Sequence, residues 1–234
     1  MGRPAETSST PSTARTTERV INLDDAPAPP AVTPPVADPA PLGLAAFALT
    51  TFLLSVKNAH WTDGTDAWLG YALAYGGFVQ LLAGMWEFRN RNVFGSTAFS
   101  TYGGFWIGLG LYVLLVAPTA ASVTQVNNDL GWILLAFAIF NFYMLLWSLQ
   151  VNMAVFAVFL TLQATEVILF IGSFSNNTET LKIGGYVGVA TAICAWYASA
   201  AGVINGMGER RVLPVGGKMV SGRRAGSPMP RTSG

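Results

Sequence analysis

One acidic residue stands out because it lies deep within an apolar stretch. Glu166 follows Asn152 by fourteen residues and is the only charged residue between Asp129 and Glu179. An acid inside a bilayer is costly in free energy, so it faces the protein interior or water. We expect Glu166 to be protonated there. It would either take part in proton coupling or block anions when charged; the other interpretation is a protonated acid that only hydrogen-bonds to a neighbouring helix.

The sequence offers little for metal or nucleophilic chemistry. His60 is the only histidine and Cys194 the only cysteine, which excludes motifs with two histidines and metal sites with several cysteines. An enzyme would need a cluster of nucleophile, base or metal ligands. The formal net charge of +1 argues against a nucleic-acid partner. We therefore expect no enzyme, no cofactor and no metal.

Composition predicts the kind of secondary structure in which Glu166 lies. Of the 234 residues, 52% are hydrophobic and 11% charged, whereas a soluble domain carries about 25% charged residues. The chain is predicted to be all-α, a polytopic membrane protein with six transmembrane helices. The predicted spans are 40–57, 67–87, 96–117, 130–149, 152–173 and 183–206. The alternative is five spans, in which the fourth and fifth form one long helix.

The regions outside the spans predict the domain organisation. Residues 1–37 are predicted to be a disordered Pro/Ser/Thr-rich tail, 38–206 the transmembrane domain, and 207–234 a basic flexible tail. Eleven of the 13 Lys and Arg residues fall on one side of six spans, because only Lys57 and Lys182 fall on the other. Since cytoplasmic loops carry the excess of basic residues, both termini are predicted to be cytoplasmic.

Small residues predict where helices approach closely. Gly104 and Gly108 have GxxxG spacing, as do Gly184 and Gly188. Such pairs let helix backbones meet, either within one subunit or between subunits. A further local signal lies before the first span, where Asp38 can cap the helix and Pro39 suits its first position.

Two longer motifs carry a resemblance to a known family. The segment Asp38-Pro39-Ala40-Pro41-Leu42-Gly43-Leu44 resembles the N-P-A-P-L-G-L signature of the acetate uptake transporter family, of the succinate–acetate permease type. Residues 83–89 and 92–106 resemble its second signature, and 211–216 its chain end. The resemblance spans about 38–217. One departure is Asp38 in place of the signature's Asn; if that position contacts substrate, the acid would repel a carboxylate.

The resemblance implies a function and a set of site residues. It implies a cell-membrane hexamer in which each subunit has its own pathway for acetate and, in some members, succinate. It implies a constriction formed by Phe47, Tyr102 and Leu162, with Ala195 at a position associated with substrate choice.

Residues near that implied constriction extend the site. Thr50 lies three residues beyond Phe47, so we expect the Thr50 and Tyr102 hydroxyls to donate to the carboxylate. Glu166 follows Leu162 by four residues and would share its helix face. The motif places Asp38, Pro39, Pro41, Gly43 and Glu87 at an entrance, with Glu87 expected to pair with Arg89 or Arg91.

Other functions remain compatible with these patterns. An apolar gate does not exclude export of acetate, or movement of a neutral weak base such as ammonia. A membrane sensor that keeps the same fold is a third possibility. The partners expected in each case are small carboxylates, the lipid bilayer and further copies of the chain.

Overall fold

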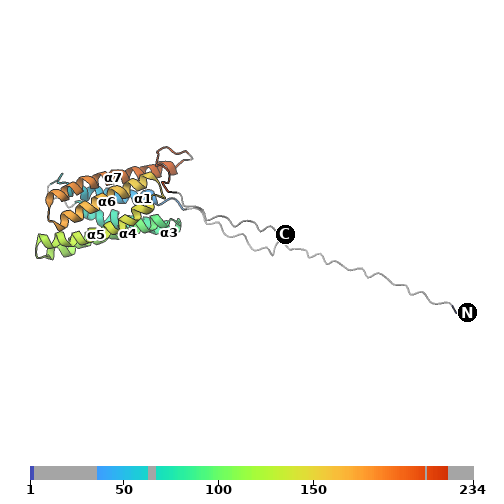
Figure 1. Ribbon diagram of the computed structural model, residues 1–234, viewed down its shortest axis with the longest axis horizontal. Coiled ribbons are helices and arrows are strands. Elements are labelled where there is room, and N and C mark those ends of the chain that lie inside the picture. The colour runs from blue at the N-terminus through green and yellow to red at the C-terminus, as the bar shows by residue number, and fades with distance from the viewer. Residues whose placement is uncertain (3–35, 63–66, 209, 221–234) are drawn as a thin grey trace. The chain divides into compact units, whose positions relative to one another are not determined.

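The regular elements of the described chain are all helices. The computed structural model describes residues 1–2, 36–62, 67–208 and 210–220, and no strand occurs within these ranges (Figure 1). In chain order the elements are α1 (Ala40–Asn58), α2 (Ala67–Tyr71), the π-helix η2 (Ala72–Val79), α3 (Gln80–Arg89), α4 (Val93–Leu111), the π-helix η3 (Tyr112–Val116), the 3-10 helix η4 (Ala117–Thr119), α5 (Val123–Ser148), α6 (Met153–Phe174) and α7 (Thr178–Gly206). The all-α prediction is confirmed.

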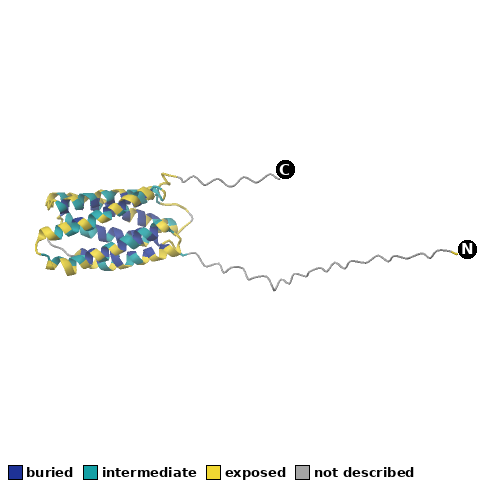
Figure 2. Cartoon of the chain, turned by 60° about the horizontal axis from the view of Figure 1, so that its bottom comes forward, coloured by how far each residue is buried: buried dark blue, intermediate teal, exposed yellow. Residues whose placement is uncertain are grey.

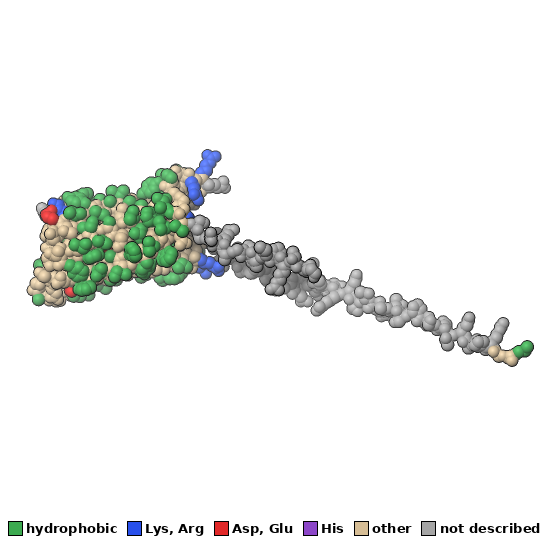
Figure 3. All heavy atoms as spheres, in the orientation of Figure 1, with side chains coloured by type: hydrophobic (Ala, Val, Ile, Leu, Met, Phe, Trp, Pro, Cys, Tyr) green, Lys and Arg blue, Asp and Glu red, His purple; other side chains and the backbone are tan. Residues whose placement is uncertain are grey.

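The helices have the length and surface of a membrane protein. Five stretches of the described part are long and apolar enough to cross a bilayer: Ala40–Asn58, Val93–Thr119, Val123–Ser148, Met153–Phe174 and Thr178–Gly206. Helices α2, η2 and α3 follow one another without a break; such a run is about as long as the hydrocarbon core is thick, about 30 Å. Apolar side chains cover the visible sides of the bundle, and charged ones gather at its ends (Figure 3). The exact count of six spans stays a prediction.

Side-chain caps fix where four helices begin. In each case the residue before the helix accepts a hydrogen bond from a backbone N–H three positions later: Asn92 from Gly95 at 3.1 Å, Ser122 from Gln125 at 3.2 Å, Asn152 from Val155 at 2.9 Å, and Asn177 from Thr180 at 2.9 Å. These caps satisfy N–H groups that have no partner within the helix. Helices α5 and α7 therefore start at residues 123 and 178, earlier than the predicted 130 and 183.

The early start of α5 has a physical reason. The prediction began after Asp129, because a charge was taken to mark the end of a loop. In the structure Asp129 lies within α5, and its Oδ2 accepts a hydrogen bond from the Tyr112 hydroxyl at 2.9 Å. A charged residue with such a partner does not have to end a helix.

Helices α5 and α6 form a tight hairpin. α5 ends at Ser148 and α6 begins at Met153, so only residues 149–152 connect them. The two helices then pack along each other (Figure 1). The alternative of one very long helix is therefore wrong, and the Asn152 cap explains why: it starts a new helix.

The two predicted glycine pairs lie in different surroundings, one packed within the bundle and one on its outer face. Helix α7 packs along α1 and α6, and a Cβ on Gly184 would come within 2.5 Å of the Leu169 side chain. A Cβ on Gly188 would likewise meet Ser55 and Thr165. The α7 pair therefore serves packing within the subunit. Gly104 and Gly108 of α4 have open space around the same position, so that pair faces away from the bundle, whose buried residues lie on the inner faces of the helices (Figure 2).

The chain folds back on the bundle after α7. We call residues 210–220 the C-terminal strap. Asn205 holds it, accepting from the backbone N–H groups of Val212 and Leu213 at 2.7 and 3.0 Å and donating to the Leu213 carbonyl at 2.8 Å. The Tyr197 hydroxyl also donates to the Pro214 carbonyl at 2.6 Å.

The predicted tails are described only in part. The prediction of a flexible segment at 207–234 concerned the strap too, and the strap is hydrogen-bonded to the bundle. Residues 221–234 and most of the predicted N-terminal tail, 3–35, lie outside the described residues. Disorder of these segments therefore stays a prediction.

Candidate substrate pathway

Four helices bring the predicted constriction residues together. Phe47 of α1, Tyr102 of α4 and Leu162 of α6 are 5%, 3% and 6% exposed and belong to one core cluster. The Phe47 and Tyr102 rings meet edge to face, with centroids 5.6 Å apart. Ala195 of α7 is fully buried in the same cluster. The small Ala195 side chain and the three larger ones thus close the centre of the bundle with apolar surface.

A small cavity of about 50 Å³ lies on one side of this constriction. Phe47, Tyr102 and Leu162 form part of its wall, together with polar side chains from α1 and α6. The polar lining side chains are Thr51, Ser55, Asn58, Thr165 and Glu166. We call this space the outer cavity, because it extends toward the end of α1, which is predicted to be extracellular. It has room for a water molecule or a few small atoms.

A larger cavity of about 570 Å³ lies on the other side, and we call it the inner cavity. Its wall combines the start of α1, the start of α6, the end of α7 and the strap. Leu44, Val155 and Ala198 line it. Leu44 precedes Phe47 by three residues, so on α1 the two cavities are separated by about one helical turn, about 5 Å. The Phe47 side chain lies within that thin barrier.

Polar partners meet the constriction at Tyr102. Its hydroxyl lies 3.1 Å from Glu166 Oε1 and 3.1 Å from Asn141 Oδ1. Glu166 is 4% exposed, and its Oε2 has no hydrogen-bond partner among the described residues. Glu166 therefore faces the predicted pathway, and it also makes the contact to a neighbouring helix that was its other expected role.

Thr51 faces the outer cavity, whereas Thr50, which was expected to face the pathway, does not. The Thr50 hydroxyl donates to the Ala46 carbonyl of its own helix at 2.9 Å, and the side chain lies against Gly76 of η2. Thr51 lines the outer cavity, and its hydroxyl has no partner among the described residues. Because 3.6 residues make a turn, Thr51 at four residues from Phe47 shares the cavity face. Of the two adjacent threonines, Thr51 is thus the one that lines the outer cavity.

Comparison with known proteins places the chain among transport proteins. Residues 23–215 match the model of the GPR1/FUN34/yaaH family. The chain belongs to this family. It is 40% identical over 195 residues to acetate permease A of Emericella nidulans, covering 76% of this chain and 65% of that protein. It is 33% identical over 182 residues to the succinate-acetate/proton symporter SatP of Escherichia coli K12, covering 77% and 96%.

A solved structure extends the similarity to the fold. The structure of the bacterial acetate channel SatP matches with a TM-score of 0.73 and 32% identity, covering 77% of this chain and 99% of that one. The chain spans less than two thirds of the length of several fungal relatives, for example 61% of one. The similarity to these GPR1/FUN34/yaaH proteins thus concerns the helical bundle.

The first signature of this GPR1/FUN34/yaaH protein locks α1 to its neighbours. Asp38 Oδ1 accepts from the Ala40 N–H at 3.0 Å, so Asp38 caps the helix from two residues before its start, beside Pro39. The Ser199 hydroxyl of α7 donates to the Pro41 carbonyl at 2.7 Å. A Cβ on Gly43 would lie 2.7 Å from the Phe99 ring of α4. Asp38 and Pro41 line the inner cavity, whereas Gly43 serves packing.

Glu87 has a different partner from the one expected. It is fully buried, and its Oε2 accepts a hydrogen bond from Asn90 Nδ2 at 3.1 Å. Gly95 of α4 leaves room for the other carboxylate oxygen. The predicted pairing with Arg89 or Arg91 is thus replaced by an amide, since the carboxylate points inward and those arginines are exposed. Asn90, unlike Glu87, lines the inner cavity.

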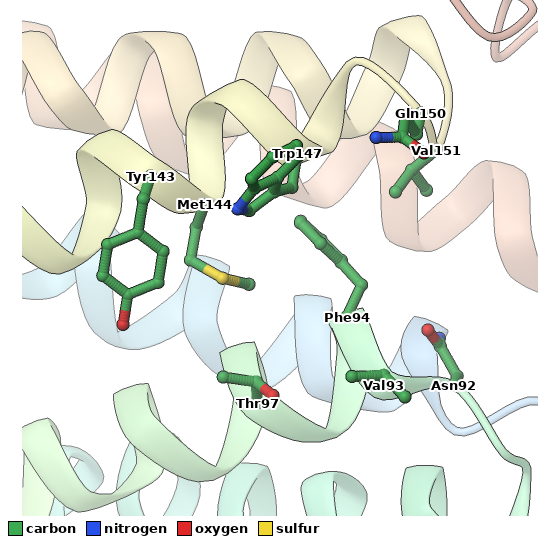
Figure 4. A pocket seen from close by; sticks show the side chains of 9 residues that line it. All are labelled: Asn92, Val93, Phe94, Thr97, Tyr143, Met144, Trp147, Gln150 and Val151. Carbon is green, nitrogen blue, oxygen red and sulfur yellow. The ribbon is translucent and has the colours of Figure 1, made fainter. Parts of the chain in front are cut away.

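A separate groove of about 620 Å³ lies between α4 and α5 and does not include the constriction. Its nine lining residues are shown in Figure 4, where Phe94 and Met144 reach into it from the two helices. Val93 and Trp147 on its walls are 79% and 56% exposed. The groove therefore opens on the apolar side of the bundle, and we do not include it in the pathway.

Two polar residues within the bundle, Asn141 and the half-buried Gln163 of α6, were not among the predicted site residues. Asn141 of α5 is fully buried, and its Nδ2 donates to Gln163 Oε1 at 2.9 Å. The available signal was a polar residue within an apolar span, which is typical of interhelical contacts. No group of three His, Cys, Asp or Glu side chains that could hold a metal ion occurs within the ranges described.

Proposed function

We propose that this protein forms a membrane pathway for acetate and related short-chain carboxylates, including succinate, through the constriction of Phe47, Tyr102 and Leu162. The observation that carries the proposal is the pair of cavities that approach this constriction from both sides. The names of acetate permease A and SatP support the substrate class. Because the function is passage, no catalytic step is included.

The lining fits a substrate with one methyl group and one carboxylate. The apolar side chains of Phe47 and Leu162 accept the methyl group. The Thr51 hydroxyl, which has no partner among the described residues, can donate to a carboxylate in the outer cavity. Among the described residues, no Lys or Arg lines this cavity, so the substrate is bound weakly enough to leave, as conduction requires.

The inner cavity adds charges near its mouth. Asp38 and Arg211 both line it, and the strap that carries Arg211 is held by Asn205. Arg211 attracts a carboxylate toward the constriction, while Asp38 opposes it. The residue at position 38 therefore affects the affinity for substrate in the inner cavity. The size of the Ala195 side chain affects which substrates pass the constriction.

We include a proton link through Glu166. Its position on the wall of the outer cavity, one turn from Leu162, supports this role, as does the printed name of the SatP symporter. An ionised Glu166 would place a negative charge beside the pathway and repel a carboxylate. A protonated Glu166 leaves the pathway neutral.

We further propose a homo-hexamer in the plasma membrane with both termini in the cytoplasm. The open face at Gly104 and Gly108 supports a contact between subunits, because small residues let helices approach. The basic residues of the strap and of the loop after α3, at the same end of the bundle, support the orientation.

Uptake of radiolabelled acetate into liposomes tests the function. Liposomes with purified protein and an alkaline interior are compared with protein-free liposomes, because acetic acid crosses lipid unaided. The proposal predicts uptake above that baseline, reduced by propionate or succinate. Absence of excess uptake from folded protein would contradict it. If ammonium were then transported, the pathway would be one for a weak base; if neither moved, a sensor would be favoured.

A further inference from the structure

A buried polar network links three helices at the constriction. It joins Tyr102 of α4, Asn141 of α5, and Gln163 and Glu166 of α6. Its hydrogen bonds are Tyr102 Oη to Glu166 Oε1 at 3.1 Å, Tyr102 Oη to Asn141 Oδ1 at 3.1 Å, Asn141 Nδ2 to Gln163 Oε1 at 2.9 Å, Asn141 Nδ2 to the Phe159 carbonyl at 3.0 Å, and Gln163 Nε2 to the Ala138 carbonyl at 3.2 Å. The positions of the hydrogens in this network decide which protonation state of Glu166 it favours.

Two backbone carbonyls fix the orientation of the amides. A carbonyl oxygen only accepts hydrogen bonds. The Asn141 atom next to the Phe159 carbonyl must therefore be its nitrogen, and the same holds for the Gln163 atom next to the Ala138 carbonyl. Asn141 then presents its oxygen to Tyr102, and this oxygen can only accept.

The Tyr102 hydroxyl has only one hydrogen for its two partners. If that hydrogen goes to Asn141 Oδ1, the contact with Glu166 is a hydrogen bond only when Glu166 donates, and hence only when Glu166 is protonated. If Glu166 is ionised, it accepts the hydrogen bond that the Tyr102 hydroxyl donates, and the fully buried Asn141 oxygen loses its donor. An unpaired buried acceptor is unfavourable. Both contacts of the Tyr102 hydroxyl can be hydrogen bonds at the same time only with a neutral Glu166.

The other described residues around Glu166 supply no compensating charge. Tyr102 is the titratable group in contact with it, and Tyr143 of α5 is the next one beyond Tyr102. From α1, Thr51 and Ser55 face the same cavity, and both are uncharged. From α7, Thr191 bonds to Thr165 at 3.0 Å and is also uncharged.

We propose that Asn141 and Gln163 are positioning residues that direct the Tyr102 hydroxyl toward Asn141 and thereby keep Glu166 protonated beside the constriction. This inference rests on the proposed function for its purpose, since a neutral Glu166 leaves the way open to a carboxylate. Its structural content, the direction of each hydrogen bond, is independent of transport. Loss of the Glu166 proton turns the Tyr102 hydrogen from Asn141 to Glu166.

Infrared spectroscopy of the protein in lipid tests the inference directly, through the C=O stretch of a protonated carboxyl group. We expect such a band at neutral pH that is lost in Glu166→Gln and shifted in Tyr102→Phe. In Asn141→Leu the side chain at position 141 has no oxygen that needs the Tyr102 hydrogen. An ionised Glu166 can then accept the hydrogen bond from Tyr102 without leaving another acceptor unpaired, so the band should vanish at a pH about one unit lower.

The controls separate this effect from general damage. Asn128→Leu makes the same substitution on the same helix, at an exposed position, and should leave the pH of band loss unchanged. If Asn141→Leu does not fold, Gln163→Leu loosens the same anchor and should lower that pH to a smaller extent. The inference is overturned if no Glu166-dependent band exists at neutral pH, or if the folded network variant loses the band at the wild-type pH. Failure of acetate uptake alone would leave the band in place and so would concern only the proposed function.

Discussion

The rings of Phe47 and Tyr102 meet edge to face across α1 and α4, with centroids 5.6 Å apart and an interplanar angle of 65°. This geometry is typical of a favourable aromatic pair. The same Tyr102 ring carries the hydroxyl that contacts Asn141 and Glu166. One side chain thus joins the apolar and the polar parts of the constriction.

The two parts are separable by Tyr102→Phe, which keeps the ring and removes the hydroxyl. Asn141 Oδ1 would lose its donor, so we expect the free energy of unfolding to fall by about 1 kcal/mol. Thermal unfolding in detergent measures this as a lower Tm. Tyr143→Phe on α5 is the control, since Tyr143 is 43% exposed. Equal Tm values for the two variants would contradict the importance of the buried hydroxyl.

Substitution by alanine should destabilise the fold at Gly103 of α4 but not at the adjacent Gly104. A Cβ on Gly103 would come within 2.7 Å of the backbone nitrogen of Leu81, whereas one on Gly104 would meet nothing within 4 Å. Backbone cannot move aside easily, so Gly103→Ala should lose about 1–3 kcal/mol of stability. Gly104→Ala should leave the fold of the single subunit unchanged, because the added methyl group lies on the outward face proposed for subunit contact. Tm and yield of folded protein check this. Comparable losses for both would show that α3 and α4 do not pack as described.

Sequence patterns predicted some of these features and missed others for identifiable reasons. Five of the predicted spans coincide with long apolar helices, because apolar length marks a membrane span in the sequence. The start of α5 was missed because Asp129 was treated as a boundary, although Tyr112 satisfies it within the helix pair. Thr51 and Asn141 were missed because their roles depend on which face of a helix turns inward, and apolar residues on all faces of a membrane helix hide that direction.

The C-terminal strap should detach when its anchor is removed. Asn205 makes three hydrogen bonds to the backbone of Val212 and Leu213. In Asn205→Ala these backbone groups turn to water, so we expect trypsin to cut at Arg210, Arg211 or Lys218 several times faster. Mass spectrometry of the fragments over time measures the rate. As a control, Asn176→Ala alters an exposed asparagine at the opposite end of the bundle; a strap cut equally fast in both variants would argue against the anchor.

In the proposed function, Leu162 helps form the narrowest part of a carboxylate pathway. Leu162→Ala shortens a side chain that is 6% exposed at the constriction, whereas Leu160→Ala makes the same change on the same helix at a position 48% exposed. The most direct measurement is the ratio of succinate to acetate uptake into liposomes containing each variant. Succinate is well suited because its charged form crosses lipid poorly. We expect Leu162→Ala to raise this ratio by about tenfold and Leu160→Ala to leave it at the wild-type value. An unchanged ratio in folded, acetate-transporting Leu162→Ala would contradict the claim.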